Sequence, residues 1–182
     1  TGRMSDLLLT HGYFLFEDEK EMQIMRPYAP LGLLYLAAYL RRAGIGVEVF
    51  DTTFATRQDL SARLSRKGSV LGVYTNLLTR ASVLEILAVA KRYGWQVVLG
   101  GPESANYPEE YLAAGADAIV LGEGEVTMAE LLPALAASGP QRLHAVPGVV
   151  FRDECGAVVT TVPRAQIPDL DSNPWPDRDQ ID

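Results

Sequence analysis

Residues 97–127 read VVLGGPESANYPEEYLAAGADAIVLGEGEVT and contain two short apolar runs that each end on glycine. Both runs are continuous rather than alternating, which is typical of parallel strands buried on both faces. The residues between them favour a short helix over 109–114, which Gly115 can close. This strand–helix–strand unit predicts an α/β fold built on a parallel sheet.

The same alternation of strand and helix extends over most of the chain. The predicted strands are short apolar runs at 6–10, 47–50, 70–74, 96–99 and 118–121. The predicted helices have amphipathic spacing or helix-ending residues and lie at 30–44, 58–66, 80–93, 109–114 and 126–137. Five such units predict a flavodoxin-like, Rossmann-like doubly wound sheet with strand order 2-1-3-4-5. Residues 11–29 show no clear period, so we expect a long loop there, of a kind that is usually functional or mobile.

The character of the chain changes after residue 146. Residues 148–152 and 157–161 flank a turn that contains Gly156, which predicts a β-hairpin. The remaining residues are rich in proline and aspartate and predict an extended linker. We therefore expect an αβα domain over 4–146, followed by a hairpin and linker over 147–182. Residues 1–3 precede Met4 and are interpreted as an expression remnant.

Composition excludes several classes of function. The net charge of −7 argues against general nucleic-acid binding and against a basic membrane-surface patch. No apolar run reaches the roughly 20 residues that a spanning helix needs. The one cysteine, Cys155, allows neither an intrachain disulfide framework nor a cysteine-rich metal site. A lone cysteine suits a reducing compartment, and we expect a cytoplasmic protein.

Ligands of doubly wound sheets bind at the carboxyl ends of the strands. This chain places the following residues there: Thr10-His11-Gly12, Asp51-Thr52-Thr53, Tyr74-Thr75-Asn76, Gly100-Gly101-Pro102 and Gly122-Glu123-Gly124-Glu125. Glycine lets a ligand approach the main chain without meeting a Cβ atom. Two glycine clusters on neighbouring strands thus predict a slot beside the sheet edge, and ordinary βα turns are the alternative.

The same edges argue against the common ligands of αβα domains. Neither the dinucleotide fingerprint G-x-G-x-x-G nor a phosphate-binding G-x-x-x-x-G-K-[ST] loop is present. A phosphate-receiving signalling domain needs aspartate at positions where this chain has Tyr74-Thr75 and Thr10-His11. His11 either faces a ligand or is an ordinary hydrogen-bonded residue, and Glu123 is open to both interpretations. Glu125 is interpreted as a residue that favours a helix start.

An ordered series of motifs carries a family resemblance. It comprises YAPLGLLYLAAYLRRAG at 28–44, VEVFD at 47–51, VLGGPE at 98–103, GADAIVLGEGE at 115–125, PGV at 147–149 and IPDLD at 167–171. This series resembles the N-terminal cobalamin-binding domain of cobalamin-dependent radical S-adenosylmethionine enzymes. The resemblance covers nearly the whole chain after Met4.

The resemblance implies a corrinoid lying across the carboxyl edge, with its nucleotide tail in the slot. Thr75-Asn76-Leu77 resembles the S-x-L element that contacts the tail, and Gly100-Gly101 matches the glycine pair of the family. The implied cofactor-binding residues are Thr10, His11, Asp51, Thr52, Thr53, Thr75, Asn76, Leu77, Gly100, Gly101, Pro102, Gly122, Glu123 and Gly124. No catalytic residue and no protein ligand to a metal is expected.

One motif departs from many cobalamin-binding domains, which carry D-x-H-x-x-G with a histidine that ligates cobalt. The matching run here, residues 51–56, reads DTTFAT, so Thr53 stands in the histidine position and Thr56 in the glycine position. A hydroxyl is a poor cobalt ligand compared with imidazole. We therefore expect cobalamin to be bound base-off and His-off, with the lower face of cobalt empty or held by water or a loop residue.

A second departure concerns the other half of such enzymes. Their radical domain binds an iron–sulfur cluster through C-x-x-x-C-x-x-C and also binds S-adenosylmethionine, whereas this chain has only Cys155. We expect a piece of a longer enzyme that binds cobalamin and catalyses nothing alone, with a missing C-terminal radical domain as partner. The resemblance implies methyl transfer to an unactivated carbon, or ring formation or rearrangement. The alternatives are a stand-alone corrinoid carrier and a cofactor-free αβα regulatory or interaction domain.

Overall fold

A seven-stranded sheet forms the centre of the molecule in the computed structural model, which describes residues 7–66, 68–137 and 140–181. Its strands are β1 (Leu7–His11), β2 (Val47–Phe50), β3 (Val70–Tyr74), β4 (Gln96–Gly100), β5 (Ala118–Val120), β6 (Val149–Arg152) and β7 (Val158–Thr160). The first five strands are parallel and follow the order 2-1-3-4-5, which confirms the predicted α/β fold and strand order.

The predicted C-terminal hairpin is present, but it also extends the sheet. β6 pairs antiparallel with β5, and β7 pairs antiparallel with β6, so the sheet has seven strands instead of the predicted five. The physical reason is that β5 would otherwise leave a row of unpaired backbone groups at the sheet edge. The sequence pattern predicted the hairpin but held no information on which strand it would join.

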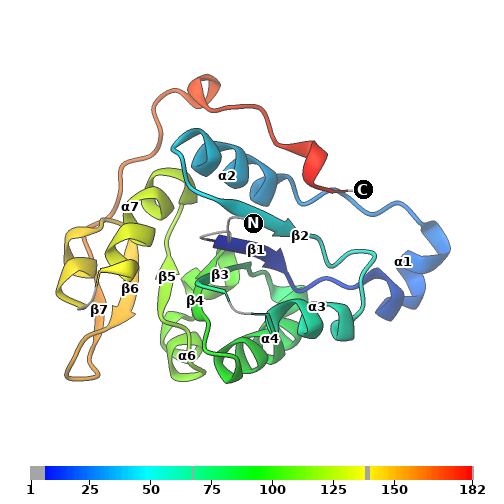
Figure 1. Cartoon of the computed structure of the whole chain (residues 1–182), viewed down its shortest axis with the longest axis horizontal. Coiled ribbons are helices and arrows are strands. Elements are labelled where there is room, and N and C mark those ends of the chain that lie inside the picture. The colour runs from blue at the N-terminus through cyan, green and yellow to red at the C-terminus, as the bar shows by residue number, and fades with distance from the viewer. Residues whose placement is uncertain (1–6, 67, 138–139, 182) are drawn as a thin grey trace.

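Helices cover both faces of the sheet, as Figure 1 shows. On one face, α2 (Leu31–Arg42) and α7 (Gly124–Ala136) pack against Leu7, Leu9 and Val98. On the other face, α3 (Arg57–Leu64), α4 (Arg80–Arg92) and α6 (Pro108–Ala113) pack against residues of the opposite parity, such as Leu8 and Leu71. Both parities of the strands are therefore buried, which is why their apolar runs are continuous.

Two short α-helices and a 3₁₀ segment were missed in the sequence. The segment expected as a featureless loop contains η1 (Leu15–Glu17) and α1 (Glu19–Ile24), which starts where the Asp18 carboxylate accepts the backbone N–H groups of Lys20 and Glu21. A helix of six residues is too short to show a helical period. A further helix, α5 (Pro102–Asn106), begins on proline directly after β4. The remaining short 3₁₀ segments are η2 (Leu77–Thr79), η3 (Pro140–Ala145), η4 (Leu170–Ser172) and η5 (Arg178–Gln180).

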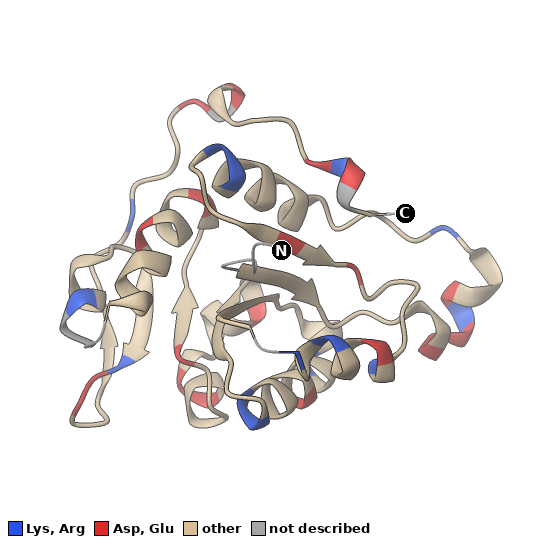
Figure 2. Cartoon of the chain, in the orientation of Figure 1, with Lys and Arg blue, Asp and Glu red and all other residues tan. Residues whose placement is uncertain are grey.

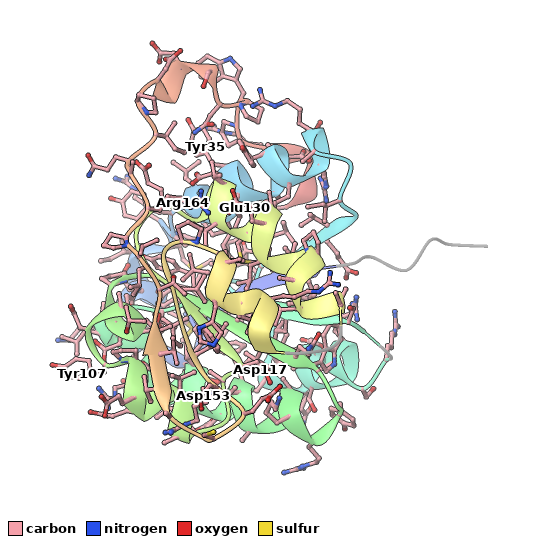
Figure 3. All side chains as sticks on the ribbon, turned by 90° about the vertical axis from the view of Figure 1, so that its left-hand side faces the viewer. Tyr35, Tyr107, Asp117, Glu130, Asp153 and Arg164 are labelled. Carbon is pink, nitrogen blue, oxygen red and sulfur yellow. The ribbon has the colours of Figure 1, made fainter. Side chains whose placement is uncertain are left out.

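The residues after the hairpin, 163–181, return along α7 and are called the C-terminal strap here. Arg164 Nε donates to Thr127 Oγ1 of α7 at 2.8 Å, and its guanidinium pairs with Glu130. Figure 3 shows Arg164 and Glu130 together on this side of the molecule. The backbone N–H of Ile167 donates to Glu123 Oε2 at 2.6 Å. The expected linker is thus held against the domain over its first part.

The second part of the strap crosses α2. Arg42 Nη1 donates to the carbonyl of Ser172 at 2.9 Å, and Arg41 pairs with Asp177. These arginines lie in the last turn of α2, where positive charge also favours the negative end of the helix. The expression remnant predicted for residues 1–3 and the first residue of the strand predicted at 6–10 lie outside the described residues.

Charged residues are scattered over the molecule. Figure 2 shows Lys and Arg at separate positions on the helices and the strap, mostly beside acidic residues. This arrangement agrees with the ion pairs of Arg57, Arg63 and Arg80 with neighbouring glutamates. Within residues 7–66, 68–137 and 140–181, no helix combines the length and the apolar character needed to cross a bilayer.

Candidate functional site

A cavity of about 210 Å³ lies between the sheet and the pair α2 and α7. One end of the cavity is bordered by residues that end or follow the parallel strands. The lining residues come from four strands, two helices and the loops that join them: Leu9, Gly32, Leu33, Leu36, Gly72, Val73, Tyr74, Val98, Leu99, Gly100, Gly101, Val120, Gly122, Gly124, Glu125 and Met128. The cavity is thus the slot that the glycine clusters predicted, and we call it the slot below.

The end of the slot at the carboxyl edge is open because glycine stands there in place of larger side chains. Leu9, Gly72 and Val98 are paired in register across β1, β3 and β4, and Gly100 follows Val98 on the same face. A Cβ atom placed on Gly100 meets nothing within 4 Å, and the same holds for Gly122 two residues after β5. Side chains at these two positions would project into open space, so the glycines leave room there.

Gly101 has a different role from its neighbour. Its φ of 104° lies in a region that favours glycine, and a Cβ atom there would be 2.2 Å from the carbonyl oxygen of Thr75. Thr75 is buried, and its hydroxyl donates to the carbonyl of Gly100 at 2.9 Å and accepts the N–H of Ser104 at 3.0 Å. Thr75 therefore holds the end of β3 against the start of α5, and Pro102 begins this helix.

The residues after Thr75 reach the surface. Asn76 begins η2, with its Oδ1 accepting the N–H of Thr79 at 3.0 Å. Leu77 and Leu78 are 74% and 91% exposed, although both are large apolar side chains. Exposed aromatic residues also lie at or beyond the ends of the first four parallel strands, namely Phe16 after β1, Phe54 after β2, Tyr74 at the end of β3 and Tyr107 after β4 and α5. We call these six residues the apolar rim, because each is exposed and lies at or beyond the carboxyl end of one of the strands β1 to β4.

His11 is buried at the end of β1, with both ring nitrogens in use. Its Nε2 lies 2.7 Å from Asp51 Oδ1, and its Nδ1 accepts the backbone N–H of Tyr13 at 3.2 Å. An Nδ1 atom that accepts from an amide carries no proton, so Nε2 is the donor to Asp51. Thr52 packs against the same ring, and its hydroxyl donates to the carbonyl of Tyr13 at 2.7 Å. The geometry favours the interpretation of His11 as an ordinary hydrogen-bonded residue.

Asp51 is held as a carboxylate. Burial raises the pKa of Asp51, but hydrogen bonds from His11 and from Thr53 outweigh this effect and hold the pKa below its usual range. Thr53 is only 3% exposed, and its carbonyl accepts the N–H of Leu15 at 3.0 Å. The half-buried Asp51 and the buried Thr53 thus join the loop after β2 to the loop after β1.

The predicted site residues fall into three groups. Four of them line the slot: Gly100, Gly101, Gly122 and Gly124. Five are buried and hold strands and loops together: Thr10, His11, Thr52, Thr53 and Thr75. The other five have separate roles. Asn76 and Pro102 start helical segments, and Asp51 holds the loop after β2. Glu123 holds the strap, and Leu77 belongs to the apolar rim.

Several lining residues were not predicted. Gly72 lies in the middle of β3 and Gly32 in α2, and both line the slot. A glycine inside a strand is an unusual feature and was a usable signal, although the space beside Gly72 is taken by the Leu9 side chain, whose Cδ2 would lie 2.7 Å from an added Cβ atom. The apolar residues Leu9, Leu36 and Met128 gave no such signal, because core residues have the same composition. Among the described residues, no group of three or more His, Cys, Asp or Glu gathers as a metal site.

Comparison with known proteins gives consistent results. Residues 25–132 match the family described as B12 binding domain. An uncharacterized methyltransferase of Pyrococcus horikoshii, PH0819, is 30% identical over 162 residues, which are 84% of this chain and 34% of that protein. An uncharacterized methyltransferase of Synechocystis sp., sll1242, is 32% identical over 97 residues, or 53% of this chain and 17% of that protein.

Solved structures share the fold. The cobalamin-dependent S-adenosylmethionine radical enzyme OxsB with aqua-cobalamin and S-adenosylmethionine bound matches with a TM-score of 0.73 and 20% identity. That match covers 90% of this chain and 23% of OxsB. Apo OxsB matches with a TM-score of 0.72 over 97% of this chain and 24% of that one. This chain therefore spans about a third or less of the length of each of these relatives.

Proposed function

The chain belongs to the B12-binding domain family, and from this premise we propose that it holds cobalamin base-off and His-off. The nucleotide tail enters the slot, and the corrin lies across the carboxyl edge of the sheet. The observation that carries this proposal is the open space at Gly100 and Gly122, where a Cβ atom would fill part of the slot. These glycines thus fit a nucleotide tail that passes close to the main chain, where no side chain stands in its way.

The size of the slot supports a cofactor whose nucleotide tail lies inside the slot and whose corrin ring lies outside it. Its volume of about 210 Å³ is below the ~300–1,000 Å³ of pockets that hold drug-sized ligands. One bicyclic ring fits such a volume, whereas the much larger corrin must stay outside. The apolar rim supplies exposed side chains there, including Phe54 and Leu77. Exposed apolar groups gathered at one edge are typical of a surface that is covered in the functional state.

The arrangement of the histidines supports the His-off state. His11 donates its Nε2 proton to Asp51 and uses Nδ1 as an acceptor, so neither nitrogen is free to bind cobalt. His144 packs edge-to-face on Phe151 of β6, away from the parallel strand ends. Thr53, in the position of the missing histidine ligand, is buried and offers only a hydroxyl. These two histidines are the only ones in the chain.

We further propose that the chain is the cobalamin-binding part of a radical S-adenosylmethionine methyltransferase. The names of the two relatives and the shared fold with OxsB support this proposal. Bound cobalamin would supply methyl-transfer chemistry, while the residues of this chain bind and orient it. The iron–sulfur cluster and S-adenosylmethionine would bind a C-terminal domain toward which the strap leads. The domain limits of 4–146 remain a prediction, and β6 and β7 complete the same sheet.

The test is equilibrium titration of the chain with hydroxocobalamin, followed by a visible spectrum of the desalted complex. We expect binding with a base-off spectrum, and at least about tenfold weaker binding for Gly100→Leu, whose side chain fills the slot. Ala157→Leu introduces the same leucine side chain at an exposed position in the hairpin turn and should bind like the wild type. A folded wild type that binds no corrinoid overturns the proposal. Equal binding by Gly100→Leu would show that the tail does not enter the slot.

A further inference from the structure

The inner part of the slot differs in chemistry from its mouth. The inner lining consists of apolar side chains and one glycine: Leu9, Leu33, Leu36, Gly72, Val98, Val120 and Met128. Among the described lining residues, only Tyr74 and Glu125 carry side-chain hydrogen-bonding groups. Tyr74 is the last residue of β3, and Glu125 is the second residue of α7, so both lie at the mouth.

The backbone of the inner part offers no free hydrogen-bonding groups either. Leu9, Gly72 and Val98 lie in the middle of β1, β3 and β4, and each of these strands is paired with neighbours on both sides. In a paired parallel strand, the N–H and C=O groups are used by the ladder. A polar group that enters this part of the slot therefore loses its water and gains no partner.

We infer that the slot selects the lower base of the corrinoid, and that it takes an alkylated benzimidazole in preference to a purine. This inference rests on the proposed function, because it requires the nucleotide tail to enter the slot. It goes beyond that function by assigning the specificity to Leu9, Val98 and Met128 on the inner walls. The mouth, with Tyr74 and Glu125, is where the sugar passes.

The chemistry of the two bases decides the preference. Dimethylbenzimidazole presents two methyl groups and a fused hydrocarbon ring, which gain by leaving water. Adenine presents an exocyclic amine and further ring nitrogens at the corresponding edge. A buried polar group without a partner weakens binding by about tenfold or more. Dimethylbenzimidazole also holds cobalt more tightly in solution than adenine does, so base-off binding starts at a disadvantage for cobalamin. A measured preference for cobalamin therefore originates in the slot.

The experiment is an equilibrium titration of the chain with three corrinoids that carry the same upper ligand. Cobalamin, adeninylcobamide and cobinamide differ only in the lower part, and cobinamide has no base at all. We expect cobalamin to bind at least about tenfold tighter than adeninylcobamide, and cobinamide to bind weakly. The readout is the dissociation constant, which does not depend on enzymatic activity.

Two variants place a polar group in the inner part of the slot. Val98→Thr adds a hydroxyl on β4, and Leu36→Gln adds an amide on the less buried wall of α2. Each is expected to reduce the preference for cobalamin by about fivefold, the value of one hydrogen bond. Val126→Thr is the matched control, because Val126 lies on α7 beside the strap and outside the slot. Thermal melts identify a variant that fails to fold. If one of the two slot variants does not fold, the corrinoid preference of the other tests the inference.

The outcomes separate the inference from the function on which it rests. If no corrinoid binds the folded chain, the proposed function fails and the inference fails with it. If all three corrinoids bind equally, or if adeninylcobamide binds best, cobalamin binding stands and the base selection is overturned. An unchanged preference in both folded slot variants likewise overturns the assignment to the inner walls.

Discussion

His11 and Asp51 form a hydrogen-bonded pair across the ends of β1 and β2, with Nε2 and Oδ1 2.7 Å apart. The pair joins the two loops that lie beneath the proposed position of the corrin. Asp51 is the first residue of the run that aligns with D-x-H-x-x-G, in which Thr53 and Thr56 replace the histidine and the glycine. The histidine that pairs with Asp51 comes instead from β1. Both ring nitrogens of His11 are consequently used to hold these two loops together.

The first prediction concerns this imidazole. His11→Gln should leave the axial coordination of bound cobalamin unchanged, because neither nitrogen of His11 is free to bind cobalt. The variant should lose about 1–3 kcal/mol in free energy of unfolding, since the Nε2–H donor to the partly buried Asp51 carboxylate is removed and a glutamine amide does not reproduce its geometry. Electron paramagnetic resonance of the cobalt(II) form measures the axial ligand. A nitrogen coupling in the wild type that disappears in His11→Gln would contradict the prediction.

The second prediction concerns acid stability. Burial raises the pKa of Asp51, but hydrogen bonds from His11 and Thr53 lower it further, and the net pKa lies below the usual value. A group with a lowered folded-state pKa contributes stability above its unfolded pKa of roughly 3.9, and this contribution is lost as pH falls through the lower folded value. Urea unfolding at pH 5, 4 and 3 should therefore show a smaller acid loss for Asp51→Asn than for the wild type. Parallel losses in both proteins would refute this role of Asp51.

The third prediction separates two adjacent glycines. Gly101→Ala should destabilise the fold by about 3 kcal/mol or more, because its Cβ would meet the Thr75 carbonyl oxygen at 2.2 Å and its φ is 104°. Gly100→Ala should change the free energy of unfolding by less than about 1 kcal/mol, since its Cβ meets open space. Denaturant unfolding of both variants measures the difference. Similar destabilisation in the two variants would show that the glycine pair has one shared role.

The fourth prediction tests the attachment of the strap. Glu123→Ala removes the acceptor of the Ile167 N–H, so the exchange rate of that amide hydrogen should rise by about tenfold. Glu123→Gln keeps an oxygen acceptor and should preserve most of the protection. Hydrogen exchange followed by nuclear magnetic resonance measures both variants. Unchanged protection in Glu123→Ala would mean that Arg164 and the α2 contacts hold this part of the strap without Glu123.

The fifth prediction concerns Tyr111 on α6. Its hydroxyl is the one buried side-chain polar group without a hydrogen-bond partner within the described part of the chain. Tyr111→Phe removes this group and should raise the free energy of unfolding by about 1 kcal/mol. Tyr93→Phe, at an exposed position, should stay within about 0.5 kcal/mol of the wild type. A clear loss of stability in Tyr111→Phe would reveal a partner for the hydroxyl.

Local patterns in the sequence were sufficient for the five parallel strands and for the glycines that line the slot. Continuous apolar runs such as Leu7–His11 and Gln96–Gly100 occur because both faces of each strand are buried, and this requirement is visible residue by residue. The glycines at 100, 101, 122 and 124 were expected at the ligand edge, and all four line the slot. The helix α1 was missed because its six residues hold too little period to detect, whereas α6, of the same length, was marked by the glycine that follows it.

Only the tertiary structure decided what each of these residues does. Gly100 opens onto the slot while Gly101 lies against the Thr75 carbonyl, and this difference depends on a strand that is distant in sequence. The pairing of β6 with β5, the contact of Ile167 with Glu123 and the pair His11–Asp51 are likewise long-range contacts. Sequence patterns report on local backbone preference and burial. Which distant groups meet is determined by how the layers pack, and that is a property of the whole fold.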